Sequence, residues 1–349
     1  MEVIARDPLH LVGGEVVSWD DAGQIQRHGE HAAPLATVAL EPGEIITGVA
    51  RNERAWFALT RGGRVHGFAR DGTPLSFLGA PLRLNHPWSR VRSCASPDGR
   101  WLVAGGDDGP LVAWRVDAGP SERLAIALEA PPADSVGGTP VWSCDGRWLA
   151  VAAGTGAVAV WELREVPVLV HQIPAPSGYR GSWGPPAVRF RVDHQLVVAW
   201  DDLRLDRIEL ATGAVVDSAA RRTMFGSRTV LSPDARWGVV ADRGELSLFS
   251  TDRPERLVVL TFRPDERHVP IAVDDRARWL VTRRAGRCSI AALDPYGVAL
   301  PPIELGAQWL GVWLSPDGER LITVNAHGNR ASWWRLDALQ ALHEQLICR

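Results

Sequence analysis

Lysine is missing from this sequence, because all 38 of its basic residues are arginines. This absence excludes Schiff-base catalysis, which needs a lysine amine, and phosphate-binding loops that depend on lysine. Long apolar runs are missing too, since no stretch approaches the roughly 18 residues of a membrane-spanning helix. The first residues lack a basic segment followed by an apolar run, so we expect no secretion signal.

Cysteine is scarce and shows no pattern. The four cysteines, Cys94, Cys144, Cys288 and Cys348, include no CxxC pair. A chain of 349 residues with 46% hydrophobic residues can fold around its core without disulfides. We therefore predict four reduced thiols and a cytoplasmic protein. The formal net charge of −3 gives no reason to expect nucleic acid or an anionic membrane as the main partner.

The sequence does contain a repeat. Residues 96–119, SPDGRWLVAGGDDGPLVAWRVDAG, are similar to residues 144–165, CDGRWLAVAAGTGAVAVWELRE. Both copies begin with an Asp-Gly turn and Arg-Trp, and both end a second apolar stretch in another Trp. The first anchor occurs as Trp56, Trp101, Trp148, Trp237 and Trp279, with Gln195 and Arg320 in two other copies. The second anchor occurs as Trp19, Phe68, Trp114, Trp161, Ile208, Phe249, Ala291 and Trp334.

Successive second anchors are 41 to 49 residues apart along the whole chain, which is typical of an array of similar units. Each unit contains short β-branched or aromatic stretches separated by Gly, Asp and Pro turns, and these stretches indicate strands. Four short strands in about 45 residues predict an all-β propeller of four-stranded antiparallel blades. The repeated Trp residues (Trp56, Trp101, Trp114, Trp148, Trp161, Trp237, Trp279 and Trp334) are then predicted to pack between neighbouring blades.

The chain resembles the WD-repeat β-propeller family, of a degenerate and bacterial type, over essentially its whole length. The turns SPDG at 96–99, SPD at 232–234 and SPDG at 315–318 carry the resemblance, together with the strand ends VAWRVD, VAVWELR and SWWRLD. The resemblance implies one propeller over residues 1–337. We favour eight blades, with an N-terminal strand closing on the last blade; seven blades with an N-terminal hairpin is the alternative.

We find no candidate catalytic, cofactor-binding or metal-binding residues. The stretches expected to form the innermost strands carry no Asp or Glu before their turns, and His268 is the one histidine near them. Metal catalysis needs about three His or carboxylate ligands, and glycoside hydrolysis needs two carboxylates. The acids concentrate in Asp-Gly turns, where Asp binds backbone amides. We therefore predict a protein that is not an enzyme.

Two loop regions are the candidates for partner binding. The long loop 174–186 contains Tyr179, Arg180 and Trp183, which are residue types that often anchor interfaces. The segment 219–229 contains Arg221 and Arg222, and a basic rim of this kind suits carboxylate or phosphate groups.

The leading hypothesis is a non-catalytic protein-interaction scaffold or adaptor in a bacterial signalling, protease-regulating or defence complex, with one or more proteins as partners. The alternatives are a channel-mouth enzyme or small-ligand binder, and a nucleic-acid-associated propeller that uses the arginine rim.

The C-terminus changes its periodicity. After Asp337, a suitable N-cap, Leu339, Leu342 and Leu346 recur at helical spacing. We expect a short amphipathic helix over residues 338–349, which covers the edge of the last blade or docks a partner helix.

Overall fold

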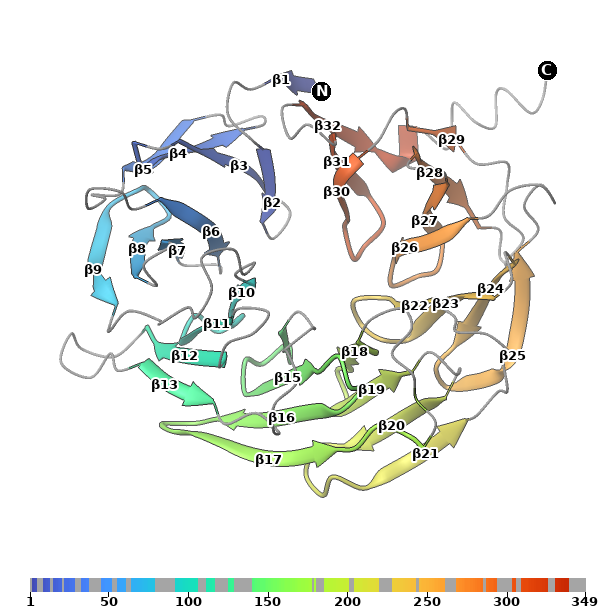
Figure 1. Ribbon diagram of the computed structural model, residues 1–349. Coiled ribbons are helices and arrows are strands. Elements are labelled where there is room, and N and C mark those ends of the chain that lie inside the picture. Colours follow the sequence, from blue (N-terminus) through green and yellow to red (C-terminus); the bar gives the residue numbers. More distant parts are fainter. Residues whose placement is uncertain are drawn as a thin grey trace, which may run out of the picture. The chain divides into compact units, whose positions relative to one another are not determined.

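A computed structural model gives the structure of the protein (Figure 1). It describes residues 2–4, 9–12, 15–20, 22–28, 33–37, 45–51, 55–60, 64–78, 92–105, 111–116, 125–128, 140–177, 179, 185–200, 204–219, 228–242, 245–260, 268–284, 287–293, 303–305, 309–325 and 330–338. The sequence analysis favoured eight blades and kept seven blades as the alternative. In the described ranges, 32 strands form eight four-stranded sheets, which we number in chain order.

The first four sheets each contain four successive strands. Sheet 1 contains β2 (Leu9–Val12), β3 (Glu15–Trp19), β4 (Gln24–His28) and β5 (Ala33–Thr37). Sheet 2 contains β6 (Ile46–Arg51), β7 (Ala55–Thr60), β8 (Val65–Ala69) and β9 (Pro74–Leu78). Sheet 3 contains β10 (Arg92–Ala95), β11 (Trp101–Gly105), β12 (Leu111–Arg115) and β13 (Ala125–Leu128). Sheet 4 contains β14 (Val141–Trp142), β15 (Trp148–Ala152), β16 (Val158–Leu163) and β17 (Pro167–Ile173).

The other four sheets follow the same plan, except that the last one includes the N-terminal strand. Sheet 5 contains β18 (Ala187–Phe190), β19 (Gln195–Ala199), β20 (Leu205–Glu209) and β21 (Val215–Ala219). Sheet 6 contains β22 (Arg228–Leu231), β23 (Trp237–Asp242), β24 (Glu245–Ser250) and β25 (Arg253–Leu260). Sheet 7 contains β26 (Val269–Val273), β27 (Trp279–Arg284), β28 (Arg287–Ala292) and β29 (Ile303–Glu304). Sheet 8 contains β30 (Trp309–Leu314), β31 (Arg320–Asn325), β32 (Arg330–Arg335) and β1 (Glu2–Ile4).

The chain divides into two compact units, one of Val17–Val188 and one of Met1–Val16 together with Arg189–Arg349. Their boundaries fall within β3 and β18. In the first unit, Trp19 Nε1 donates a hydrogen bond to the carbonyl of Ile46 (3.1 Å), which ties sheet 1 to sheet 2. The second unit contains the paired N-terminal and C-terminal strands.

The N-terminal strand completes the last sheet, as predicted. β1 pairs antiparallel with β32, with Glu2 opposite Ser332 and Ile4 opposite Arg330. This pairing gives β32 a hydrogen-bonded neighbour on its outer side, so β32 is no longer the edge of its sheet. The predicted C-terminal helix is described only at residues 336–338, which are helical, and residues 339–349 lie outside the described residues.

The two anchors of one repeat lie on opposite faces of their sheet. In sheet 3, Trp101 is opposite Arg115, whereas Trp114 is opposite Leu102. Directly opposed residues share a face and successive residues alternate, so Trp101 and Trp114 point away from each other. Sheet 4 has the same register, with Trp161 opposite Leu149.

The hydrophobic clusters lie between neighbouring sheets. Trp101 of sheet 3 shares one cluster with Trp161 of sheet 4, and the two side chains are 1% and 2% exposed. Trp279 of sheet 7 shares another with Trp334 of sheet 8. Each of these interfaces therefore combines the first anchor of one sheet with the second anchor of the next. Trp114 and Trp148 are also buried, and Trp237 is half-buried.

The alignment of Trp56 with Trp101 is wrong by one residue. Trp56 lies directly opposite Phe68, so it occupies the position that Leu102 has in sheet 3, and Ala55 takes the position of Trp101. A shift of one residue moves a side chain to the other face of a strand. The neighbouring Phe57 therefore joins the cluster of Trp114, while Trp56 is buried on the opposite face.

A serine and an aspartate organise the turn between the first and second strands of several sheets. In sheet 3, Ser96 Oγ donates to Asp98 Oδ1 (2.6 Å) and accepts from the amide of Trp101 (2.8 Å). Asp98 Oδ1 also accepts from the amide of Arg100 (3.1 Å). The pairs Ser143 and Asp145, Ser232 and Asp234, and Ser315 and Asp317 repeat this arrangement. These bonds add to the backbone pairing of the turn, in which the Ser96 amide donates to the carbonyl of Trp101 (2.8 Å).

The turns of neighbouring sheets also contact each other. Asp275 in sheet 7 accepts from the amide of Asp234 in sheet 6 (2.8 Å), and its own amide donates to the carbonyl of Pro316 in sheet 8 (3.0 Å). In sheet 4, Gly146 has a φ of +71°, and a Cβ added there would lie 2.6 Å from Asp98 Cγ of sheet 3. Only glycine accommodates both constraints without strain.

The described cysteines, Cys94, Cys144 and Cys288, form no disulfide, and Cys348 lies outside the described residues. Burial raises the pKa of the Cys94 thiol to about 12, although Trp142 Nε1 donates a hydrogen bond to its sulfur (3.0 Å). In the described part of the chain, no helix is long and apolar enough to cross a membrane.

Replacing Trp101 or Trp148 by Ala is expected to lower the free energy of unfolding by roughly 3–5 kcal/mol, because each change leaves a cavity in place of a buried ring. Chemical denaturation measures this loss. Replacement by Phe serves as the matched control and should cost less. An Ala variant with unchanged stability would contradict a packing role for these rings.

Asp275 should make stability depend on pH. Burial, followed by the nearby charges of Asp234 and Asp274, raises the pKa of Asp275 from its ordinary 3.8 to about 6. The folded state therefore holds a proton that the unfolded state has lost, and the stability contributed by that proton falls as pH rises from about 4 to 6.

The Asp275→Asn variant should be more stable than the wild type at pH 7.5 and should lack this decline, since Asn Oδ1 still accepts from the Asp234 amide. Denaturation midpoints measured across pH 4 to 8 test the expectation. Glu245→Gln, at an exposed position, is the control. Parallel pH profiles for the wild type and Asp275→Asn would refute it.

Candidate functional site

The structure describes one of the predicted partner-binding residues. Tyr179 is half-buried, and its ring packs on the turn between β15 and β16, because a Cβ added at Gly156 would lie 2.4 Å from two of its ring carbons. The amide of Tyr179 donates to the carbonyl of Pro176 (3.1 Å). Its ring is thus engaged with its own sheet. The other predicted residues, Arg180, Trp183, Arg221 and Arg222, lie outside the described residues.

The buried side chain of His268, directly before β26, contacts the side chains of sheet 7. Its side chain is buried, and Nδ1 is 2.9 Å from Thr282 Oγ1, which is 3.5 Å from Ser289 Oγ. Such a chain satisfies polar groups that would otherwise be costly to bury. Among the described residues, no group of three or more His, Cys, Asp or Glu side chains could hold a metal ion.

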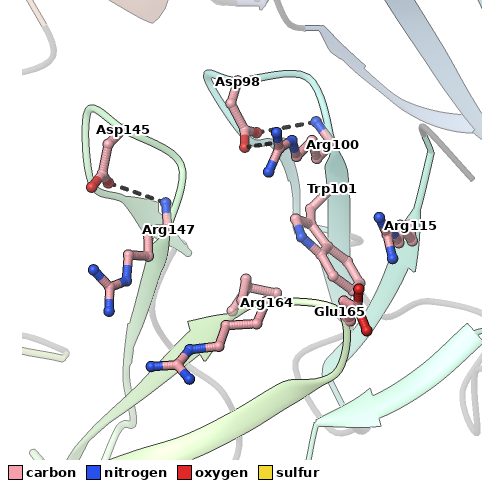
Figure 2. Close-up of a pocket in the computed structure, with 9 residues that line it drawn as sticks. Asp98, Arg100, Trp101, Arg115, Asp145, Arg147, Arg164 and Glu165 are labelled. Carbon is pink, nitrogen blue, oxygen red and sulfur yellow. Dashed lines mark hydrogen bonds and ion pairs between the residues drawn. The ribbon is translucent and has the colours of Figure 1, made fainter.

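A surface pocket of about 510 Å³ lies between sheets 3 and 4, at the turns that contain the repeated Asp residues (Figure 2). Four arginines line it, namely Arg100, Arg115, Arg147 and Arg164. The remaining lining residues are the carboxylates Asp98, Asp145 and Glu165, with Trp101 and Leu163 as apolar contributors. All of them belong to the unit Val17–Val188.

The repeat itself places these side chains together. Arg100 and Arg147 each follow an Asp-Gly turn and precede the first Trp anchor, so they occupy equivalent positions in the two sheets. Arg115 ends β12 directly opposite Trp101, and Arg164 follows the last residue of β16. In Figure 2 the two turns stand side by side, and Trp101 stands between Arg115 and Arg147.

Glu162 fixes two of the four guanidinium groups. It lies opposite Trp148 and is only 7% exposed. Its Oε1 accepts from Arg147 Nε (2.7 Å) and lies 2.8 Å from Arg164 Nε. Burial opposes the charged form of Glu162, but the hydrogen bonds and charges of Arg164 and Arg147 outweigh it and hold its pKa below the ordinary value. Arg147 also lies over the ring of Trp148, with 5.3 Å between its Cζ and the ring centre.

Two of the pocket's carboxylates have structural tasks. Asp98 and Asp145 each bind the serine hydroxyl of their turn and the backbone amide of the following arginine, as the dashed lines of Figure 2 show for the amides. The Nε of Arg100 is 3.7 Å from Asp98 Oδ2, and the Arg100 side chain is 65% exposed. The pocket therefore presents guanidinium groups whose backbone supports are rigid.

Sequence reasoning missed this pocket, although it found the Arg-Trp repeat that supplies Arg100 and Arg147. The pocket also depends on the residue opposite the first Trp anchor, and the sequence alone does not show which residue that is. It is Arg115 in sheet 3 and Glu162 in sheet 4. That residue can be identified once the strand register is known.

The arrangement of the strands is shared with known proteins, whereas no protein-family model and no curated protein sequence matches the chain. The C-terminal WD40 domain of Sif2 has a TM-score of 0.64 at 13% identity, over 95% of this chain and 97% of that domain. BamB from Moraxella catarrhalis has a TM-score of 0.63 at 14% identity, over 96% of this chain and 98% of BamB. The fold is a β-propeller.

A third similar structure shows how far this likeness extends. Hydrazine synthase from Kuenenia stuttgartiensis has a TM-score of 0.55 at 17% identity, over 83% of this chain and 95% of that one. These differently named proteins have the same architecture as this chain but only 13–17% sequence identity to it. The likeness therefore shows the fold, and any function must be argued from side chains.

Replacing Glu162 by Gln is expected to reduce stability at pH 7 by roughly 1–3 kcal/mol, because two charge-assisted hydrogen bonds are weakened. The lowered pKa of Glu162 means that its contribution is present above its ordinary value of 4.5 and is lost as pH falls further. The variant should therefore also lose less stability on acidification. Glu165→Gln, at the exposed neighbour, is the control for thermal denaturation, and equal losses in both variants would contradict the expectation.

Proposed function

We propose that this propeller is a non-catalytic protein–protein interaction scaffold, acting as an adaptor subunit of a larger complex. The observation that carries the proposal is the pocket between sheets 3 and 4. It offers three partly exposed arginines, Arg100, Arg147 and Arg164, at 65%, 53% and 66% side-chain exposure. Arginine is enriched in the energetically important parts of protein interfaces.

Preorganisation supports the same function. Glu162 holds the Nε groups of Arg147 and Arg164, so these long side chains lose less conformational freedom when a partner binds. The hydrogen-bonded turns below them limit backbone movement. A rigid platform with oriented charged groups suits recognition of a protein surface.

The chemistry of the acidic residues also favours a scaffold over an enzyme. Asp98, Asp145, Asp234 and Asp317 all accept hydrogen bonds from a serine hydroxyl and a backbone amide in their turns. A carboxylate engaged in this way is poorly suited to exchange protons with a substrate. The similarity to a WD40 domain agrees with a scaffold and is an argument from fold alone.

Affinity purification from the native cell after mild chemical cross-linking tests the proposal. The tagged protein should retain one or more specific proteins in stoichiometric amount, identified by mass spectrometry, that a tagged unrelated propeller does not retain. A protein that elutes alone at its monomer mass, with no cross-linked partner, would refute the scaffold.

The loop 174–186 gives a second, independent prediction. Replacing Arg180 and Trp183 together by Ala is expected to weaken partner capture by about 2 kcal/mol, or roughly thirtyfold, if they are interface anchors. The melting temperature should change by only a few degrees. Full capture by the double variant would reject this loop while leaving the scaffold itself intact.

A further inference from the structure

We propose that the interface between sheets 5 and 6 is a charged seam, which opens locally when salt screens its ion pairs. The charged seam consists of Arg191 and Arg207 of sheet 5 and Asp252 of sheet 6. All three residues belong to the same compact unit. The inference concerns a conformational property of the fold and goes beyond the proposed scaffold function.

Arg207 occupies a position that is uncharged in six other sheets. It lies on β20 opposite Val197, on the same face as Gln195 at the first-anchor position, and this face is turned toward sheet 6. The equivalent residues of sheets 2, 3, 4, 6, 7 and 8 are Gly67, Ala113, Val160, Leu248, Ile290 and Trp333. Leu248 shows the usual role of this position, since it joins the apolar cluster between sheets 6 and 7.

Ion pairs take the place of that apolar contact between sheets 5 and 6. Arg191 Nη1 and Arg207 Nη1 each lie 2.9 Å from Asp252 Oδ1, so one carboxylate of sheet 6 holds two guanidinium groups of sheet 5. Arg191 Nη1 also donates to the buried Thr251 Oγ1 (3.1 Å) in the same turn of sheet 6. Arg207 Nη2 pairs with Asp217 Oδ2 of its own sheet (2.7 Å).

The burial of these groups makes their carboxylate partners important. The side chains of Arg191 and Arg207 are 11% and 20% exposed, and Arg191 Nε has a further partner in Asp193 Oδ2 (3.3 Å). Arg207 Nε is buried and finds no hydrogen-bond acceptor among the described residues. Burying a guanidinium group costs free energy, which the attraction to carboxylates must offset. Because Asp252 is 50% exposed, dissolved ions can reach that carboxylate and screen the attraction.

Salt should therefore act differently on two neighbouring interfaces. Raising the ionic strength from 0.1 M to 1 M shortens the screening length from about 10 Å to about 3 Å. The attraction across the charged seam falls, whereas the apolar cluster between sheets 6 and 7 does not depend on charge. A sheet that is held less firmly by its neighbour opens its own hydrogen bonds more often.

Hydrogen exchange of the native protein, followed by mass spectrometry at 0.1 M and 1 M NaCl, tests the proposal. The amides of β20 and β21 in sheet 5 should exchange roughly three- to tenfold faster at the higher salt concentration. The amides of β27 and β28 in sheet 7 should change by less than about twofold, because that sheet packs on sheet 6 through apolar side chains.

Two variants separate the charged seam from a general effect of salt. Asp252→Asn removes the shared carboxylate charge, so its sheet 5 should exchange faster already at 0.1 M NaCl and respond little to more salt. Arg207→Met places an apolar side chain where other sheets have an uncharged residue, so it should keep sheet 5 protected at both concentrations. Arg287→Gln is the matched control and should behave like the wild type, since it removes only an exposed ion pair with Glu304 inside sheet 7 (3.4 Å).

Three outcomes would overturn the proposal. The first is an equal response to salt in sheets 5 and 7 of the wild type. The second is exchange in Asp252→Asn that matches the wild type at 0.1 M NaCl. The third is an undiminished response to salt in Arg207→Met. If a variant does not fold, the comparison of sheets 5 and 7 in the wild type decides by itself.

Discussion

The hydrogen bond from a serine hydroxyl to the aspartate two residues later organises the first turn of sheets 3, 4, 6 and 8. Ser96 and Asp98 show its effect, since the serine oxygen also accepts the amide of Trp101 and thereby sets where the second strand starts. The position of the Trp ring follows from that start. This short turn thus determines which large side chain enters the interface between two sheets.

The same turns carry the pocket. Because Asp98 and Asp145 bind their own backbones, Arg100 and Arg147 leave their turns at corresponding places. The missing side chain of Gly146 lets Asp98 approach it closely, so the two turns can lie next to each other. Fold stability and the shape of the pocket are therefore properties of one set of contacts, and a variant that disturbs a turn will affect both.

Much of the fold could be predicted from spacing, because the Asp-Gly turns and Trp anchors recur at a nearly constant interval and each has a local physical cause. The register of Trp56 could not be predicted from spacing. Ala55, Trp56 and Phe57 are all apolar, and any of them could face the next sheet. The pocket could not be predicted either, because it joins residues of different sheets. Arg115 and Glu162 become comparable only when each is seen opposite a Trp.

Some departures from the repeat keep the hydrogen bonds of the turn, and others change only the charge of a surface position. In sheet 7, Asp274 stands where other sheets have serine, yet its Oδ1 accepts from the amides of Arg278 and Trp279 (2.8 and 2.7 Å), so the turn keeps its hydrogen bonds. The position opposite the first anchor varies instead, since it is Arg115 in sheet 3, Glu162 in sheet 4 and Ala292 in sheet 7. A repeat tolerates the first kind of change because the local geometry is maintained. The second kind changes the charge of a surface position while the strand pairing stays the same.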